Sequence, residues 1–147
     1  MKVLFVCTAN TCRSPMLEYM FRAYAYARGR KDVEVQSAGM VLCDDVINPM
    51  CAKTLDRHGV PYNPAREAVF CDRKTFSGAK LVYTMTDEQK DVLAKFYGAK
   101  RKIKSLSQIV GCDVCDPYGM GEQAYEDLYR TLNGALGAIF EDVEKTK

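Results

Sequence analysis

The sequence predicts an α/β fold in which a parallel β-sheet is covered by helices on both faces. Short runs of β-forming apolar residues alternate with longer segments in which apolar residues recur at three- and four-residue steps. This alternation implies right-handed βαβ crossovers, which place helices on the two faces of one sheet. The 147 residues contain no repeat or linker-like stretch, so we expect residues 1–147 to form a single domain.

Four segments are predicted to be strands. Residues 2–6 form a short apolar run typical of a buried strand, and residues 33–37 alternate between apolar and polar side chains. A third strand is expected over residues 80–84 and a short fourth strand over residues 103–106.

The segments between and after these strands have the apolar spacing of amphipathic helices. The first helix is expected to start at Ser14 and Pro15 and to stop near Gly29, because Ser favours helix starts and Gly favours helix ends. The last segment is expected to form one long helix. The further predicted helices cover residues 49–57, 87–97 and 123–144.

The composition is that of an ordinary globular protein, with 48% hydrophobic and 27% charged residues. A net charge of +2 argues against a dedicated binder of nucleic acid or of a membrane surface. Two basic clusters, residues 28–31 and 100–104, lie beside predicted element ends, so we interpret them as solvated surface. No apolar run is long enough for a membrane span or a signal sequence, so a cytoplasmic location is expected, with the seven cysteines reduced.

The turn between the first strand and the first helix carries an unusual set of side chains. Residues 6–15 spell VCTANTCRSP, whereas turns are usually rich in Gly, Asn, Asp and Pro. Small residues let such a loop curl so that successive N–H groups point inward and bind an anion. The following helix adds its positive end, and Arg13 adds a two-pronged clamp for phosphate oxygens. The pattern predicts a cradle for a phosphoryl dianion.

Cys7 is the predicted nucleophile of this cradle. It lies at the carboxyl end of the first strand, the position where parallel sheets bind ligands. The field that holds phosphate also favours a thiolate, which is poised for in-line attack on phosphorus. Ser14 is expected to donate a hydrogen bond to the sulfur, and Asn10 to adopt a left-handed backbone conformation. A cysteine alone is more often a small buried hydrophobe. The compound pattern Cys-x5-Arg-Ser between a strand and a helix favours catalysis.

Asp116 is the best candidate for the proton donor that a leaving group requires. It lies in the stretch Cys115-Asp116-Pro117-Tyr118-Gly119, where proline stiffens the backbone beside the carboxylate. An Asp-Pro pair by itself is a common turn, so this assignment depends on the phosphate cradle. Tyr118 is expected to line the pocket wall.

The segments CTANTCRSP and DPYG resemble the signature loop and the acid loop of the low-molecular-weight protein tyrosine phosphatase family. The order along the chain also matches, and the resemblance covers essentially the whole chain. It implies a three-layer fold with a four-stranded parallel sheet and helices on both faces. It also implies hydrolysis of phosphorylated protein side chains through a phosphocysteine intermediate, with no metal and no cofactor.

Carried over residue by residue, the resemblance makes Cys7 the nucleophile, Arg13 the phosphate clamp and Asp116 the general acid. Ser37, after the second strand, is implied to support the loop. Substrate contacts are implied for Thr8, Ala9, Asn10, Thr11, Cys12, Ser14 and Tyr118. The chain departs from the family pattern at two positions. Ala9 replaces the usual glycine, and Asn63, close to Arg66, stands about where many relatives have a supporting histidine.

Thr8 and Thr11 bear on the substrate. The eukaryotic-type members usually have Leu and Ile at these positions, whereas the bacterial branch resembling protein arginine phosphatases has Thr at both. Isoleucine offers an apolar wall suited to an aromatic ring, while threonine is shorter and offers a hydroxyl to a guanidinium with several donors. The pair favours phosphoarginine over phosphotyrosine as the substrate.

Several alternatives stay open from the sequence. The chain could be a strict tyrosine phosphatase, or a thiol-dependent arsenate reductase, although residues 80–102 lack the resolving cysteines that such a reductase requires. Cys112 and Cys115 have metal-ligand spacing and could complete a zinc site with Cys7 and Cys12. A disulfide from Cys7 to Cys12, Cys112 or Cys115 could instead protect the nucleophile from oxidation.

Overall fold

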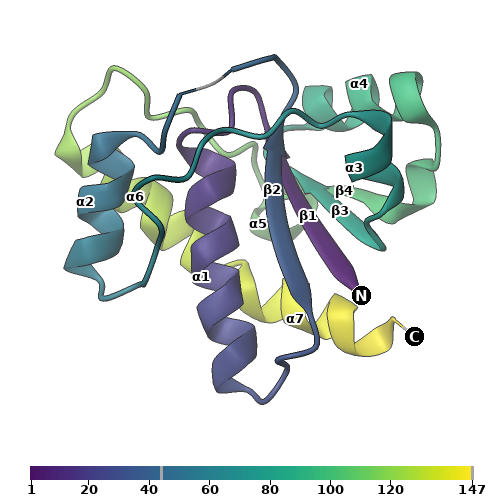
Figure 1. The fold of residues 1–147 in the computed structure, drawn as a ribbon, viewed down its shortest axis with the longest axis horizontal. Helices are drawn as coiled ribbons and strands as arrows, with labels where there is room; N and C mark the ends of the chain where they lie inside the picture. Colours follow the sequence, from purple (N-terminus) through teal and green to yellow (C-terminus); the bar gives the residue numbers. More distant parts are fainter. Residues whose placement is uncertain (44, 147) are drawn as a thin grey trace.

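The computed structural model describes residues 1–43 and 45–146, which form a four-stranded, all-parallel sheet with helices on both faces (Figure 1). The strands lie in the order β2-β1-β3-β4. This confirms the predicted fold class and all four predicted strands, with ends moved by one or two residues. The strands are β1 (Lys2–Cys7), β2 (Glu34–Gly39), β3 (Leu81–Thr84) and β4 (Ile103–Ser105).

The central strand β1 is buried on both of its faces. Val3 pairs with Val35 of β2 on one side and with Leu81 of β3 on the other. Along β1, Val3 and Phe5 point into one hydrophobic core, whereas Leu4 and Val6 point into a second. This explains the continuous apolar run, because a strand covered on two faces has no polar side to present.

The larger core lies between the sheet and the helices α1 (Arg13–Ala27), α6 (Glu122–Asn133) and α7 (Leu136–Lys145), with α2 (Pro49–Arg57) packed against α6. The smaller core lies on the opposite face, under α3 (Arg73–Ser77) and α4 (Asp87–Tyr97). Figure 1 shows these two groups of helices on either side of the sheet. A 3-10 turn (Lys100–Lys102) precedes β4, and the short helix α5 (Ser107–Val110) follows it.

Local signals account for the helix ends that the sequence predicts. Helix α4 begins with a complete capping box, in which Thr86 accepts from the Gln89 N–H and the Gln89 side chain accepts from the Thr86 N–H. The Asn48 side chain caps α2 by accepting from the Met50 N–H, and Pro49 occupies the first helical position.

Helices α3 and α5 are not among the predicted helices. They span five and four residues, which is too short to show a periodic apolar pattern.

The prediction of one long helix over residues 123–144 is wrong, because the chain turns at Gly134 and Ala135 between α6 and α7. Both residues keep backbone angles close to helical values, so the apolar spacing continues through the turn and hides it. Ala135, within this turn, is fully buried. The turn allows α6 to pack on α2 while α7 packs on α1.

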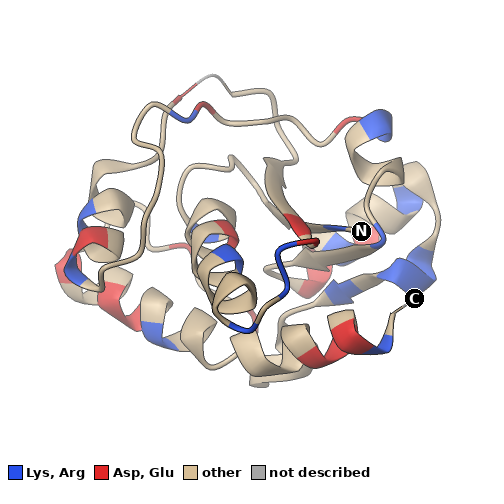
Figure 2. Cartoon of the chain, turned by 60° about the horizontal axis from the view of Figure 1, so that its bottom comes forward, with Lys and Arg blue, Asp and Glu red and all other residues tan. Residues whose placement is uncertain are grey.

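Both signs of charge are distributed over the helices, as Figure 2 shows. The basic cluster 100–104 is only partly free surface: the Lys102 ammonium donates to the carbonyl groups of Phe76 and Ala79, and Lys104 pairs with Asp142 at 2.9 Å. Within the described residues, every helix is too short or too polar to cross a bilayer.

Cys7 ends β1 between its two neighbours, β2 and β3. From β1 the chain crosses to β2 on one side, and it later returns past β1 to β3 on the other. The loops at the carboxyl ends therefore separate above β1, and open α/β sheets bind ligands in the crevice that results.

Candidate active site

The loop that follows β1 curves around a pocket of about 260 Å³. Most of the predicted site residues line this pocket, whereas Ser14 and Ser37 lie behind the loop, within hydrogen-bond reach of the Asn10 side chain. The lining residues are Cys7, Thr8, Ala9, Asn10, Thr11, Cys12, Arg13, Asp45, Asp116 and Tyr118.

The carbonyl groups of the loop are held on its outer side. The Met40 N–H donates to the carbonyl oxygens of Cys7 (3.0 Å) and Thr8 (2.8 Å), and the Asn48 N–H donates to that of Thr11 (2.9 Å). Neither donor lines the pocket, so these carbonyl dipoles point away from it. The loop therefore presents its amide side to the pocket, as an anion-binding nest does.

Asn10 gives the loop its tight curl. It has a φ of +61°, as predicted, and is fully buried. Its backbone N–H lies 3.3 Å from the Cys7 sulfur. Among the described residues, Asn10 and Ala99 alone of the non-glycine residues have positive φ, so Ala9 replaces the family's glycine without left-handed strain.

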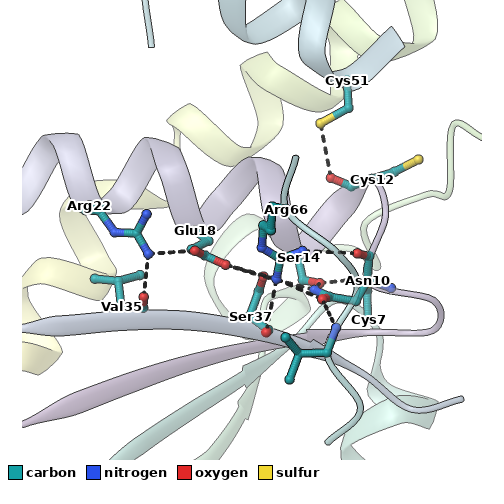
Figure 3. A network of polar contacts seen from close by, with 11 residues as sticks. Cys7, Asn10, Cys12, Ser14, Glu18, Arg22, Val35, Ser37, Cys51 and Arg66 are labelled. Atoms are coloured by element: carbon teal, nitrogen blue, oxygen red, sulfur yellow. Dashed lines mark hydrogen bonds and ion pairs between the residues drawn. The ribbon is translucent and has the colours of Figure 1, made fainter. Parts of the chain in front are cut away.

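The Asn10 side chain connects the loop to its surroundings (Figure 3). The Val69 N–H can only donate, and it lies 2.9 Å from Asn10 Oδ1, which places the oxygen of the amide on that side. The Asn10 nitrogen must then face the two serines, and Nδ2 donates to Ser14 Oγ at 2.8 Å and to Ser37 Oγ at 2.9 Å. Each serine oxygen is thereby an acceptor, and its single hydrogen is left for another partner.

For Ser14 that other partner is Cys7, whose sulfur lies 2.9 Å from Ser14 Oγ. The expectation that Ser14 starts the first helix is off by one residue, because α1 begins at Arg13. The N-cap residue, Cys12, makes no side-chain capping bond. The positive end of α1 therefore opens onto the pocket, and the Ser14 hydroxyl faces the sulfur.

Arg13 joins the two loops that the sequence singles out. Its guanidinium is buried, donates to the Val114 carbonyl at 3.0 Å and lies 3.8 Å from the Asp116 carboxylate. Asp116 is half exposed at the pocket rim, and its carboxylate accepts from the Tyr118 N–H. The Val114 N–H is bonded to the Met85 carbonyl, so the acid loop is anchored to the carboxyl end of β3 as well as to Arg13.

A family model described as low molecular weight phosphotyrosine protein phosphatase matches residues 2–147. This chain belongs to that family. The match extends over nearly the whole chain, which confirms the resemblance seen in the sequence.

Two curated relatives in this family are equally similar to the chain. A low molecular weight protein-tyrosine-phosphatase from Staphylococcus haemolyticus is 30% identical over 95% of this chain and 97% of its own. A protein-arginine-phosphatase from Bacillus subtilis is 30% identical over 100% of this chain and 99% of its own. A solved structure, described as YwlE arginine phosphatase, a mutant with a phosphorylated active site serine, is 29% identical. The match covers 99% of this chain and 97% of the chain in that structure, with a TM-score of 0.89.

Within this phosphatase family site, the two threonines have different surroundings. The Thr8 hydroxyl accepts from Gln89 Nε2 at 3.2 Å, and the Gln89 oxygen is itself held by the N–H groups of Met85 and Thr86. Thr11 lies farther round the loop, with its hydroxyl 3.9 Å from the Cys12 sulfur. Tyr118 lines the pocket, as expected, and its 72% exposure places it at the rim.

The cysteines near the pocket have separate partners. The Cys12 sulfur lies 3.7 Å from the Tyr125 hydroxyl, and burial raises the pKa of the Cys12 thiol. Burial also raises the pKa of Cys51 strongly, so both groups remain thiols near neutral pH. In the described part of the chain no three His, Cys, Asp or Glu side chains gather as metal ligands would, which gives the zinc-site alternative no support. Protection of Cys7 by Cys12, which lines the same pocket, stays a prediction.

Three residues at or beneath the pocket were missed in the sequence. Asp45 lines the pocket from the connection after β2, and Glu18 and Arg66 reach the Asn10–Ser37 network from α1 and from the segment before α3. No local motif marks them, because each is brought to the site by a long-range contact. Asn63 is exposed, whereas Arg66, three residues farther on, contacts the side chains of Asn10 and Ser37.

Gly39, the last residue of β2, lies directly against the loop. A Cβ at Gly39 would be 2.9 Å from the backbone atoms Ala9 C and Thr8 O, which cannot move without changing the loop. We expect Gly39→Ala to lower the free energy of unfolding by about 1–3 kcal/mol. It should also weaken inorganic phosphate binding, because the loop supplies the donors. Urea unfolding and phosphate titration measure the two effects.

The matched control is Gly137→Ala in α7, where the new Cβ would meet Tyr24 Oη at an ordinary 3.6 Å. This variant should be more stable than wild type by about 0.4–1 kcal/mol and bind phosphate normally. Equal behaviour of the two variants would contradict the close approach at Gly39.

Proposed function

We propose that this chain is a cysteine-dependent protein phosphatase that hydrolyses phosphoarginine side chains of proteins through a phosphocysteine intermediate. One observation carries the proposal: the Cys7 sulfur lies inside a loop that presents its amide side to the pocket, 2.9 Å from the Ser14 hydroxyl and 3.3 Å from the Asn10 N–H. A thiolate, the form of cysteine that attacks phosphorus, can accept both of these hydrogen bonds.

In the first step, the loop N–H groups and Arg13 hold the phosphoryl oxygens while the Cys7 thiolate attacks the phosphorus in line. The S–P bond forms as the bond from phosphorus to the leaving nitrogen or oxygen breaks. Asp116, at the pocket rim and 3.8 Å from Arg13, delivers its proton to that departing atom. The products are the dephosphorylated side chain and phosphocysteine.

In the second step, water attacks the phosphocysteine. The Asp116 carboxylate takes a proton from the water, an O–P bond forms and the S–P bond breaks, which releases inorganic phosphate. The electron pair of the S–P bond returns to sulfur, where the Ser14 hydrogen bond stabilises the thiolate. The phosphorylated active-site serine of the related YwlE mutant supports a covalent phosphoenzyme in this family.

The preference for phosphoarginine depends on the pocket residues, because relatives of equal identity are named for phosphotyrosine and for phosphoarginine. Thr11 leaves the wall of the pocket short and polar. Two carboxylates, Asp45 and Asp116, also face the pocket. A phosphoarginine brings a cationic guanidinium with several donors to these carboxylates, whereas a phosphotyrosine ring brings neither charge nor donors.

The assignment of Cys7 and Asp116 is tested by substitution. Cys7→Ser should abolish turnover, because a hydroxyl is not ionised near neutral pH. Asp116→Asn should slow hydrolysis of poor leaving groups by about 10²–10⁴-fold and of an activated aryl phosphate much less. Cys43→Ser, outside the pocket lining, is the control and should behave as wild type. Wild-type turnover by Cys7→Ser would falsify the mechanism.

Thr11 tests the substrate class. Thr11→Ile fills the polar space with apolar bulk, while the phosphate donors, loop N–H groups and Arg13, are unaffected. We expect phosphoarginine hydrolysis to fall relative to phosphotyrosine hydrolysis by about 10–200-fold. The measurement is the ratio of kcat/KM values on the two substrates in both proteins. An unchanged ratio would favour the strict tyrosine phosphatase.

Asp45 tests the same preference through charge. Because the carboxylate is exposed, Asp45→Asn should remove only about 0.2–1 kcal/mol of attraction for a guanidinium, or about 1.5–5-fold in the same ratio. The difference should shrink as salt is raised. Asp32→Asn, an exposed carboxylate paired with Arg30 before β2, makes the same charge change as a control. A ratio that moves equally in both variants would rule out a local role for Asp45.

A further inference from the structure

Behind the pocket lies a buried ion pair that the two chemical steps do not use. The side chain of Arg66 is only 10% exposed and that of Glu18 only 7%, with Arg66 Nη2 3.2 Å from Glu18 Oε1. Neither residue lines the pocket. Burying two charges costs free energy unless their remaining hydrogen-bonding groups find partners. The partners of Arg66 and Glu18 therefore indicate the role of the pair.

Arg66 binds the two side chains that support the catalytic loop. Its Nη2 lies 2.8 Å from Asn10 Oδ1 and 2.7 Å from Ser37 Oγ (Figure 3). The Ser37 hydroxyl in turn donates to Glu18, whose second oxygen accepts from Arg22 at 2.6 Å. The ion pair therefore closes a network that runs through Asn10 to Ser14 and the Cys7 sulfur.

Arg66 and Glu18 determine which group donates and which accepts in each hydrogen bond of this network. A guanidinium can only donate hydrogen bonds, and an ionised carboxylate can only accept them. Arg66 therefore holds the Asn10 oxygen on its own side, and Glu18 takes the hydrogen of Ser37. The Asn10 nitrogen is left to donate to Ser14, and the Ser14 hydrogen is left for Cys7. When Cys7 is a thiolate, which can only accept, reversing any one of these bonds would set two donors or two acceptors against each other.

We propose that Arg66, held in place by Glu18, is a positioning residue that orients the Ser14 hydroxyl toward the Cys7 sulfur through Asn10. This inference rests on the proposed function, because it assigns Arg66 to the hydrolysis of phosphocysteine. When Ser14 donates to the departing sulfur, the S–P bond breaks faster. Without Arg66, the Asn10 side-chain oxygen keeps only the Val69 N–H as a donor. The Asn10 amide is then free to rotate, and the Ser14 hydroxyl hydrogen is no longer held toward the Cys7 sulfur.

The segment before Arg66 explains how this side chain reaches the interior. Asn63 accepts from the Ala65 N–H with its side chain and from the Arg66 N–H with its carbonyl, which forms a turn. The turn directs Arg66 beneath the loop and leaves Asn63 exposed. Unlike a histidine, whose two ring nitrogens can each be donor or acceptor, an arginine offers only donors at this position.

The test compares Arg66→Lys with Arg22→Lys in the intact chain. Both variants keep a cation beside Glu18, but Arg22 contacts neither Asn10 nor Ser37, so it is the matched control. We expect Arg66→Lys to lower kcat and KM together by about 10–100-fold, because slower loss of a covalent intermediate lowers both, with kcat/KM and inorganic phosphate inhibition little changed. The decay of phosphocysteine, followed by intact mass after rapid mixing, should slow by the same factor. Arg22→Lys should match wild type.

A double-mutant cycle with Ser14→Ala separates positioning from general loss of structure. If Arg66 acts through the Ser14 hydroxyl, Arg66→Lys should have little further effect on kcat once Ser14 is alanine. Additive effects of the two changes would overturn the proposal. If Arg66→Lys fails to fold, Arg66→Gln replaces it in the same cycle, because Arg22 still pairs with Glu18 in that variant.

A readout without substrate separates this inference from the proposed function. The two side-chain amide hydrogens of Asn10 should exchange slowly with solvent in wild type and in Arg22→Lys, and faster in Arg66→Lys, as followed by NMR. Exchange that is unchanged in Arg66→Lys would overturn the positioning role. The wild-type protein could hydrolyse neither phosphoarginine nor phosphotyrosine while exchange is still faster in Arg66→Lys. That result would show that Arg66 orients Asn10 and would reject the proposed function.

Discussion

The left-handed backbone of Asn10 is the constraint on which the rest of the site depends. With a φ of +61° in a fully buried position, this residue bends the loop so that its N–H meets the Cys7 sulfur. Most residues resist this conformation, and glycine, which accepts it readily, has no side chain to hold neighbouring groups. Asparagine does both, because its amide accepts from the Val69 N–H and donates to two serines. The curl of the loop, the N–H that meets the sulfur and the contacts to the two serines thus all depend on one residue.

The loop holds its shape because the long connection between β2 and α3 passes around its outer side. Met40 and Asn48 bind its carbonyl groups, Gly39 packs against its backbone, and Val69 and Arg66 bind Asn10. A loop whose carbonyl groups are satisfied from outside can keep its amide groups free for an anion. The shape of the proposed phosphate site therefore depends on Gly39, Met40, Asn48, Arg66 and Val69 as well as on the loop itself.

The charged groups are arranged in two layers with different tasks. Arg13 faces the pocket and ties the acid loop to the phosphate loop through the Val114 carbonyl and Asp116. Arg66 and Glu18 lie behind the pocket, where no substrate reaches, and their hydrogen bonds end on Asn10 and Ser37. A buried ion pair contributes little stability by itself. The role proposed for this pair is to orient hydrogen bonds. Arg66 can only donate and Glu18 can only accept, so the hydroxyl groups of the network are held in one orientation.

The sequence by itself determined the parallel sheet, its four strands, and the strand–loop–helix unit that carries Cys7, Asn10, Arg13 and Ser14. These follow from local pattern: apolar runs, helix starts and stops, and a motif in which neighbouring residues share one loop. The turn at Gly134 was hidden, because near-helical backbone angles preserve the apolar spacing through it.

Only the tertiary structure decided which distant residues reach the site. Asp45, Arg66 and Glu18 are separated from Cys7 by 38, 59 and 11 positions, and no period or motif links them to it. They meet because β2 and the connection after it return beside β1, and because a buried polar group must find a partner wherever the fold supplies one. Local sequence specifies which groups need partners, whereas the packing of distant segments selects the partners.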